Sequence, residues 1–173
     1  MNNLLTPERL KEMLSYDPKT GHWTWLVDTK TGRGAGRVHM KAGSQAGAVS
    51  HAKGYRKIGI DGQRFLAHRL AFLWMTGEWP KHHVDHIDGD GGNNAWNNLR
   101  DVTRSVNMQN RKRATKDSLT GILGVTFNRN RQKWVAQITI NNAPKGLGYF
   151  ETSEAAHHAY LEAKRQLHPG NTL

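Results

Sequence analysis

Residues 84–107, with the sequence VDHIDGDGGNNAWNNLRDVTRSVN, gather oxygen and nitrogen donors that could carry out phosphodiester chemistry. Hydrolysis of a phosphodiester needs a base that activates water and a cation that stabilises the negative charge developing on the phosphate. Asp85 offers a hard oxygen ligand, His86 an imidazole whose ordinary pKa lies near neutrality, and Asn107 a second oxygen ligand. These groups suffice for a nuclease with one metal ion, and hard ligands favour Mg²⁺ or Mn²⁺ over zinc.

The same stretch can also be interpreted as an ordinary turn, because Asp, Asn and Gly are the residues that turns use. Composition alone supports the turn and the metal site about equally. The metal site also meets a geometric obstacle, since adjacent side chains of a regular strand point to opposite faces. Asp85 and His86 could serve one phosphate only if the strand is twisted or bulged there, which the glycines that follow would permit.

The charge of the chain indicates a polyanionic partner. Its 173 residues include 25 Lys and Arg against 14 Asp and Glu, which gives a formal net charge of +11. Residues 81–110 depart from this balance with three basic and four acidic side chains, an arrangement suited to holding a cation against a phosphate. We therefore expect a nucleic acid as the partner. No small-molecule cofactor is expected. RNA is the weaker alternative, because the sequence lacks the exposed aromatic pairs of single-strand binders.

Several features argue against a membrane or secreted protein. The apolar stretch RFLAHRLAFLWM is interrupted by His68 and Arg69 and is too short to span a bilayer. The start, MNNLLTPERLKEML, has no positive segment followed by an apolar run, so we expect a cytosolic protein, in the host cytosol if a phage encodes it. Cysteine is absent, which excludes disulfides and thiolate zinc sites.

Elements on both sides of residues 84–107 could position the candidate site. Apolar periodicity and capping residues predict helices over 6–16, 64–75 and 104–114, and strands over 22–27 and 55–60. Asn107 would lie on the third of these helices, with Thr103 as its cap. Residues 29–47 are rich in Gly, Arg and Lys and are either a basic loop along a phosphate backbone or a solvated loop. His68 is expected to be structural.

The C-terminal part of the chain predicts a separate small module. The segments GILGVTFNRN, KWVAQITIN and GLGYF have the pattern of short strands, and SEAAHHAYLEAKRQL that of an amphipathic helix capped by Ser153. A three-stranded meander packed on one helix is a complete unit. The basic run that precedes it suits a helix C-terminus and a DNA phosphate, with the candidate contacts Arg111, Lys112 and Arg113.

The segments HRLAF and VDHIDGDGGNNAWNNLRDVTRSVNMQN resemble the HNH family of nucleases, in the branch of phage and intron-encoded homing endonucleases whose last motif His is replaced by Asn. The resemblance covers about residues 54–112 and implies two antiparallel strands and a helix around one divalent metal. It implies that Asp85 and Asn107 bind the metal and that His86 activates water. Asn98 would bridge the loop by hydrogen bonds and so orient His86.

The segments GVTFNRNRQKWVAQITIN and LGYFETSEAAHHAYLEAKRQL resemble the AP2 DNA-binding domain, known from plant transcription factors and found fused to phage HNH nucleases. The resemblance covers about residues 121–166 and implies a sheet laid in the major groove. It implies DNA contacts by Arg129, Arg131, Lys133, Trp134 and Gln137. The spacing before Trp134 is one residue longer than in the plant pattern, and Thr139 stands where those domains often carry Arg. Base specificity is therefore not transferred, and Trp134 could equally be a core residue.

The sequence thus predicts an α+β protein in which a ββα-metal nuclease module is joined to an AP2-like sheet with one helix. The expected parts are an N-terminal region of helix, strand and basic loop (1–53), the nuclease module (54–113), a basic linker (114–120) and the DNA-binding domain (121–173). The expected function is endonucleolytic cleavage of double-stranded DNA by a monomer with one Mg²⁺ or Mn²⁺. The alternative is a catalytically silent DNA-binding regulator or packaging accessory protein, but a decayed site would be expected to lose at least one of Asp85, His86 and Asn107.

Overall fold

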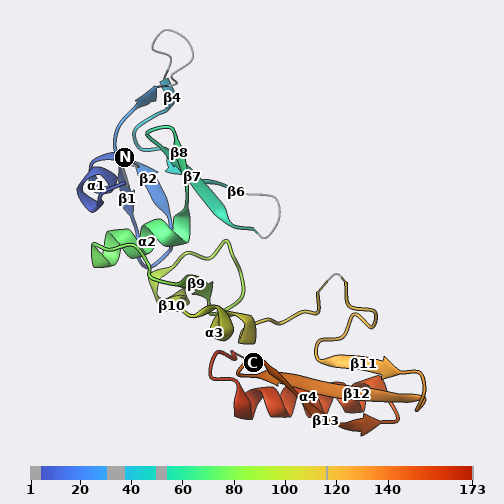
Figure 1. Cartoon of the computed structure of the whole chain (residues 1–173). Coiled ribbons are helices and arrows are strands. Elements are labelled where there is room, and N and C mark those ends of the chain that lie inside the picture. The colour runs from blue at the N-terminus through green and yellow to red at the C-terminus, as the bar shows by residue number, and fades with distance from the viewer. Residues whose placement is uncertain (1–4, 31–37, 50–53, 116, 173) are drawn as a thin grey trace. The chain divides into compact units, whose positions relative to one another are not determined.

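The chain folds as two compact units, Met1–Asp101 and Val102–Leu173, in which helices and strands are mixed as predicted (Figure 1). The computed structural model describes residues 5–30, 38–49, 54–115 and 117–172. Part of the predicted basic loop therefore lies outside the described residues. The expected domain boundaries at residues 53, 113 and 120 stay predictions. Within the described part of the chain, no helix combines the length and apolar character that crossing a bilayer needs.

The first unit consists of short strands around two helices. Its elements in chain order are α1 (Pro7–Met13), β1 (Leu14–Tyr16), β2 (Trp23–Trp25), β3 (Thr29–Lys30), β4 (Val38–Met40), β5 (Gln45–Ala46), β6 (Ala48–Val49), β7 (Arg56–Ile60), β8 (Gln63–Leu66), α2 (Ala67–Thr76), β9 (His83–His86), the 3₁₀ turn η1 (Trp96–Asn98) and β10 (Leu99–Val102). The sheets join β1, β2 and β5, then β3 and β4, then β6, β7 and β8, and finally β9 and β10.

The helix predicted over 64–75 begins later than expected, because its first residues form strand β8. Asp61 and Gly62 both have positive φ, at 49° and 79°, and make a two-residue turn between β7 and β8. Ile60 and Gln63 pair directly across this turn. The strand was missed because Phe65 and Leu66 also fit helical spacing.

The core of the first unit joins the N-terminal strands to the strands that carry the candidate site. The ring of Trp23 packs on Tyr16 with 4.6 Å between centroids and meets Trp74 of α2 edge-on at 5.7 Å. Val84 of β9 and Leu99 of β10 belong to the same buried cluster. Strands β9 and β10 are therefore anchored to a core that begins near the N-terminus.

The second unit contains α3 (Arg104–Gln109), β11 (Val125–Asn128), β12 (Lys133–Ile140), β13 (Ala143–Phe150) and α4 (Ser153–Leu167). The three strands form an antiparallel sheet in the order β11-β12-β13. Ala136 and Ile138 of β12 are buried together with Ala156 and Tyr160 of α4, which shows that α4 covers one face of the sheet. Gln137 alternates with these residues and is exposed.

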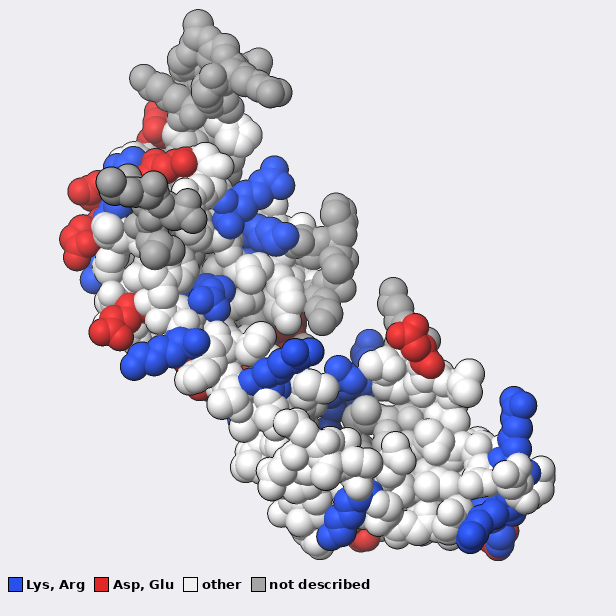
Figure 2. Space-filling view, viewed as in Figure 1, with Lys and Arg blue, Asp and Glu red and all other residues white. Residues whose placement is uncertain are grey.

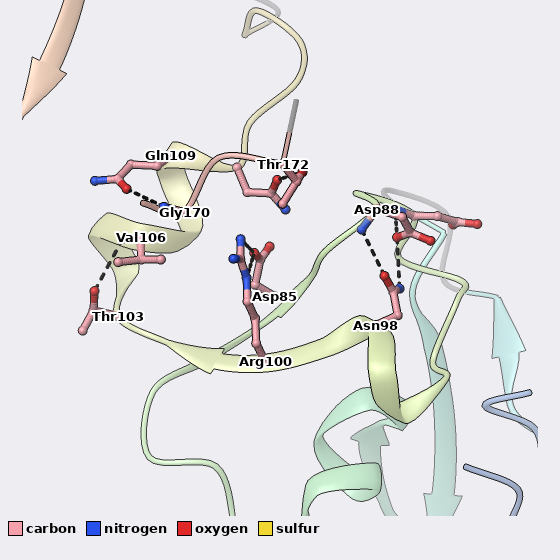
Figure 3. A network of polar contacts seen from close by, with 11 residues as sticks. Asp85, Asp88, Asn98, Arg100, Thr103, Val106, Gln109, Gly170 and Thr172 are labelled. Carbon is pink, nitrogen blue, oxygen red and sulfur yellow. Dashed lines mark hydrogen bonds and ion pairs between the residues drawn. The ribbon is translucent and has the colours of Figure 1, made fainter. Parts of the chain in front are cut away.

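Two helix boundaries in the second unit differ from the sequence prediction. α3 ends at Gln109 instead of near residue 114, and the backbone N–H of Gly170 donates to the Gln109 side chain at 3.0 Å (Figure 3). The cap of α4 is Thr152, whose side chain accepts from the N–H of Ala155 at 3.2 Å, so Ser153 is the first helical residue and not the cap. Both neighbours are good caps, and the sequence alone did not distinguish them.

Replacement of Gly124 by alanine is expected to destabilise the second unit by about 3 kcal/mol, combining left-handed strain with overpacking. Gly124 has φ +76°, and a Cβ atom there would lie 2.0 Å from the Tyr160 ring. Gly121, with φ +66° and open space around it, provides the matched control. Denaturant unfolding followed by NMR signals of β12 should show a clearly smaller loss for Gly121→Ala. Equal losses for the two variants would contradict the predicted clash.

Candidate functional site

Asp85 lies on β9 as a buried carboxylate paired with an arginine of the neighbouring strand. It is 7% exposed. Nε and Nη2 of Arg100 on β10 donate to the same carboxylate oxygen, Oδ2, at 2.9 Å and 2.7 Å (Figure 3). Charge-assisted bonds of this kind are strong and directional. The guanidinium thus compensates the buried charge and fixes the carboxylate relative to β10.

The ring of His86 is buried and is held by Asn94. Nε2 of His86 lies 3.1 Å from Oδ1 of Asn94, while Nδ2 of the same amide donates to the carbonyl of Gly92 at 3.4 Å. An amide oxygen only accepts hydrogen bonds, so Nε2 of the neutral ring carries the proton. The lone pair of the ring is therefore on Nδ1, which is the atom that could take a proton from water.

Adjacent residues on a regular strand would not both face one site, yet Asp85 and His86 are both buried. His86 is the last residue of β9, and its carbonyl accepts from the N–H of Gly89 at 2.9 Å. The chain therefore leaves the strand at His86. Whether both side chains face one phosphate is not decided by this geometry, and their joint role stays a prediction.

His68 of α2 packs against His86. The two rings meet edge-on with 5.0 Å between centroids, and the Tyr55 ring contacts both, at 5.2 Å from His68 and 5.7 Å from His86. Burial, followed by the charges of His86 and Arg69, lowers the pKa of His68 from 6.5 to about 3. His68 is thus neutral near neutral pH and fills space behind His86, which fits the structural role predicted for it.

Asn98 closes the loop that connects β9 to β10. Its side-chain oxygen accepts from the N–H of Asp88 at 3.0 Å, and its Nδ2 donates to Oδ1 of Asp88 at 3.0 Å and to the carbonyl of Asn93 at 2.8 Å (Figure 3). These bonds bridge the two ends of the loop. The bond to the His86 ring comes from Asn94, a residue that the sequence analysis did not select.

Asn107 lies on α3, in the second unit. Thr103 caps this helix by accepting from the N–H of Val106 at 3.4 Å (Figure 3). The structure thus brings Asp85, His86 and Asn98 into one unit with their partners and places Asn107 in the other. A metal site shared by Asp85 and Asn107 stays a proposal.

Comparison with known proteins identifies the segment that carries these residues. Residues 65–109 match the family model described as HNH endonuclease. This HNH segment includes Asp85, His86, Asn98 and Asn107. Among solved structures, one described as "DNA binding and cleavage by the HNH homing endonuclease I-HmuI" is 21% identical, with a TM-score of 0.41 over 84% of this chain and 76% of that chain. No curated protein matches the chain.

The donors of the HNH segment fit a hydrated cation held by few protein ligands. Among the residues that the structure describes, no three His, Asp or Glu side chains are grouped closely enough to hold a metal ion. Mg²⁺ commonly keeps several waters and binds through one or two carboxylates together with substrate phosphates. The carboxylate of Asp85 is a group of this kind, and an ion that binds it would compete with the two hydrogen bonds from Arg100.

The residues expected to contact DNA divide into exposed and partly buried ones. Arg129, Arg131 and Gln137 are exposed, and the Arg131 guanidinium lies 4.6 Å from the centroid of the Tyr149 ring. Lys133 pairs with Glu151. The basic residues after α3 are also exposed, namely Arg111, Lys112 and Arg113.

Trp134 is partly buried and packs against the core of the second unit. Its ring meets the ring of Phe127 of β11 edge-on, with 5.0 Å between the centroids. This position favours the core interpretation of Trp134 over the DNA contact.

Figure 2 shows Lys and Arg side chains on both units in this view, whereas the acidic side chains of the first unit gather mainly on the side of α1.

Proposed function

We propose that the chain is a metal-dependent endonuclease that hydrolyses phosphodiester bonds in double-stranded DNA, with the HNH segment as its catalytic part. The observation that carries this proposal is the pair of adjacent buried residues Asp85 and His86, each held by its own partner, Arg100 and Asn94. A nuclease needs a hard oxygen ligand next to a general base, and these two side chains supply both.

Each residue has a separate role in the proposed reaction. Nδ1 of His86 accepts the proton of the attacking water, and the bond from Nε2 to Asn94 keeps the ring in the required tautomer. Asp85 and Asn107 would hold a divalent cation, with Mg²⁺ or Mn²⁺ preferred by oxygen ligands. When bound, the cation would stabilise the negative charge that develops on the phosphate. Asn98 keeps the loop between the strands closed.

The second unit would bring the catalytic part to DNA. Its antiparallel sheet is covered on one face by α4, so the exposed residues of β12 and of the turn before it stand on the other face. Arg129, Arg131 and Gln137 give this surface positive charge and hydrogen-bonding groups. We infer an AP2-like mode of binding from the sequence resemblance and from this arrangement of one sheet and one helix.

Incubation of the purified protein with supercoiled plasmid tests the proposal. Mg²⁺ or Mn²⁺ should convert the plasmid to nicked or linear forms, and EDTA should stop the reaction. A gel shift without cleavage across Mg²⁺, Mn²⁺ and Zn²⁺ would support the alternative, a DNA-binding regulator without turnover.

Loss of Arg129 or Arg131 is expected to weaken DNA binding and to flatten its salt dependence. Each phosphate contact contributes about one unit to the slope of log K against log salt concentration. Fluorescence anisotropy with labelled duplex at several salt concentrations measures this slope. Arg165, exposed on α4 on the covered side of the sheet, provides the control variant Arg165→Ala. A slope lowered equally by Arg165→Ala would argue against binding by the exposed sheet face.

Arg100→Gln is expected to increase the affinity for Mn²⁺ by about tenfold, because the guanidinium competes with a cation for Asp85 and repels it. Arg100→Lys keeps the positive charge and should change this affinity much less. Isothermal titration of the protein without DNA measures the affinity directly. Weaker Mn²⁺ binding by Arg100→Gln would instead mean that Arg100 holds Asp85 in the position needed for ligation.

A further inference from the structure

The residue that holds His86 is itself held by the N-terminal strands, outside the HNH segment. The hydroxyl of Tyr16, at the end of β1, donates to the backbone carbonyl of Asn94 at 2.7 Å, and this bond is buried. Asn94 is 1% exposed. The backbone of Asn94 therefore binds Tyr16, while its side chain binds His86.

The turn between β1 and β2 packs directly on the same loop. A Cβ atom at Gly21, where φ is +73°, would lie 2.2 Å from the carbonyl carbon of Asn94, so only glycine allows this approach. The carbonyl of Pro18 accepts from the N–H of Trp96 at 2.8 Å. Asp17 stiffens the turn, because its carboxylate accepts from the backbone of Lys19 at 2.9 Å and from the Thr20 hydroxyl at 2.7 Å.

The hydroxyl of Tyr16 has a fixed position and a fixed protonation state. The ring of Tyr16 packs on Trp23 in the core of the first unit, so its position follows from the core and not from the loop. Burial, followed by the charge of Asp17, raises the pKa of Tyr16 above its usual value. The group is therefore a hydrogen-bond donor over the working pH range, and a carbonyl is the partner that it requires.

We propose that Tyr16 is a positioning residue for His86, acting through Asn94, so that the hairpin of β1 and β2 completes the catalytic site of the HNH segment. The path runs from the Tyr16 hydroxyl to the Asn94 carbonyl, and from the Asn94 side chain to Nε2 of His86. The role of the hairpin rests on the proposed function, because it matters for catalysis only if His86 is the base. The placement of the His86 ring by Asn94 and Tyr16 does not depend on that function and can be measured without DNA.

Cleavage kinetics test the catalytic consequence. Tyr16→Phe keeps the ring in the core and should lower the single-turnover cleavage rate by about tenfold, the effect of one buried hydrogen bond, with unchanged DNA affinity. Asn94→Ala should lower the rate by about 100-fold, because a small displacement of a reacting group is costly. Asn94→Asp retains an acceptor oxygen and should recover most of the loss. The matched controls are Tyr160→Phe, in the core of the second unit, and Asn97→Ala, an exposed asparagine of the same loop.

Nitrogen NMR of the imidazole tests the placement itself on the full chain without metal or DNA. At a pH above the ordinary histidine pKa, His86 of the wild type should show protonated Nε2, with the signal assigned by its absence in His86→Ala. Tyr16→Phe and Asn94→Ala should shift this signal toward a mixture of tautomers, whereas the controls should not. An unchanged signal together with an unchanged cleavage rate in Tyr16→Phe would overturn the proposal. If Tyr16→Phe and Asn94→Ala shift the tautomer of His86 but the wild type cuts no DNA, the proposed function is refuted. The positioning of His86 through Asn94 would then still stand.

Discussion

Replacement of His86 by alanine is expected to slow DNA cleavage by about 10³-fold, within the usual range for loss of a general base. DNA binding should be nearly unchanged, since the exposed basic residues that we assign to binding lie in the second unit. The rate of nicking under single-turnover conditions and the affinity from a gel shift in EDTA separate these two effects. A fall in rate without a fall in affinity assigns His86 to the chemical step.

Two further variants make this result specific. His83 lies on the same strand but is exposed, and His83→Ala should cut at the wild-type rate. His86→Ala leaves a buried gap beside Asn94, into which free imidazole can diffuse, so added imidazole should restore part of the rate. Asp85→Ala should also be inactive, but imidazole should not rescue it. Persistent cleavage by His86→Ala in the absence of imidazole would reject His86 as the base.

The chemistry of the site could be predicted from residue types, but the residues that hold Asp85 and His86 in place could not. Asp85 and His86 stand out as a carboxylate and an imidazole in a basic chain. Arg100 was not selected, because a sequence does not show which residue of β10 lies beside which residue of β9. The pairing of the two strands brings its guanidinium to the carboxylate. An unexplained arginine just after a predicted ligand loop is the signal that could have found it.

The choice among the asparagines of the loop was also beyond the sequence. Asn93, Asn94, Asn97 and Asn98 have the same donors and acceptors, and their spacing does not rank them. A contact with a distant part of the chain distinguishes Asn94 from the other three, because its carbonyl accepts from Tyr16, which lies 78 positions earlier. Asn94 is buried by that contact, whereas Asn97 is exposed.

The fold was predicted best where local chemistry decides it. The Asp61–Gly62 turn follows from its two residues, because both tolerate positive φ. The strand after it does not follow, since Phe65 and Leu66 satisfy helical and strand patterns equally and only pairing with β7 decides between them. The sheet and helix of the second unit were predicted from alternation and capping residues. The cap of α4 is one residue earlier than predicted, and β13 begins at Ala143, three residues before the predicted strand.

His68 is expected to make the first unit sensitive to acid. Its pKa is lowered from 6.5 to about 3 in the folded state, first by burial and then by the charges of His86 and Arg69. Between these two values the unfolded chain binds a proton at this position and the folded chain does not. The contribution of neutral His68 to the free energy of unfolding is therefore complete above pH 6.5. Below that pH the free energy of unfolding decreases by about 1.4 kcal/mol per pH unit for one proton.

Substitution of His68 by phenylalanine removes this proton uptake while keeping an aromatic ring against Tyr55 and His86. Between pH 6.5 and pH 4 the variant should lose about 3 kcal/mol less unfolding free energy than the wild type. Urea unfolding followed by tryptophan fluorescence reports mainly on the first unit, which contains five of the six tryptophans. The exposed His22 supplies the control, and His22→Phe should keep the wild-type pH dependence. If the unfolding free energies of His68→Phe and the wild type change in parallel with pH, His68 takes up its proton in the folded protein as well. The buried contact between His68 and His86 would then have to open in acid.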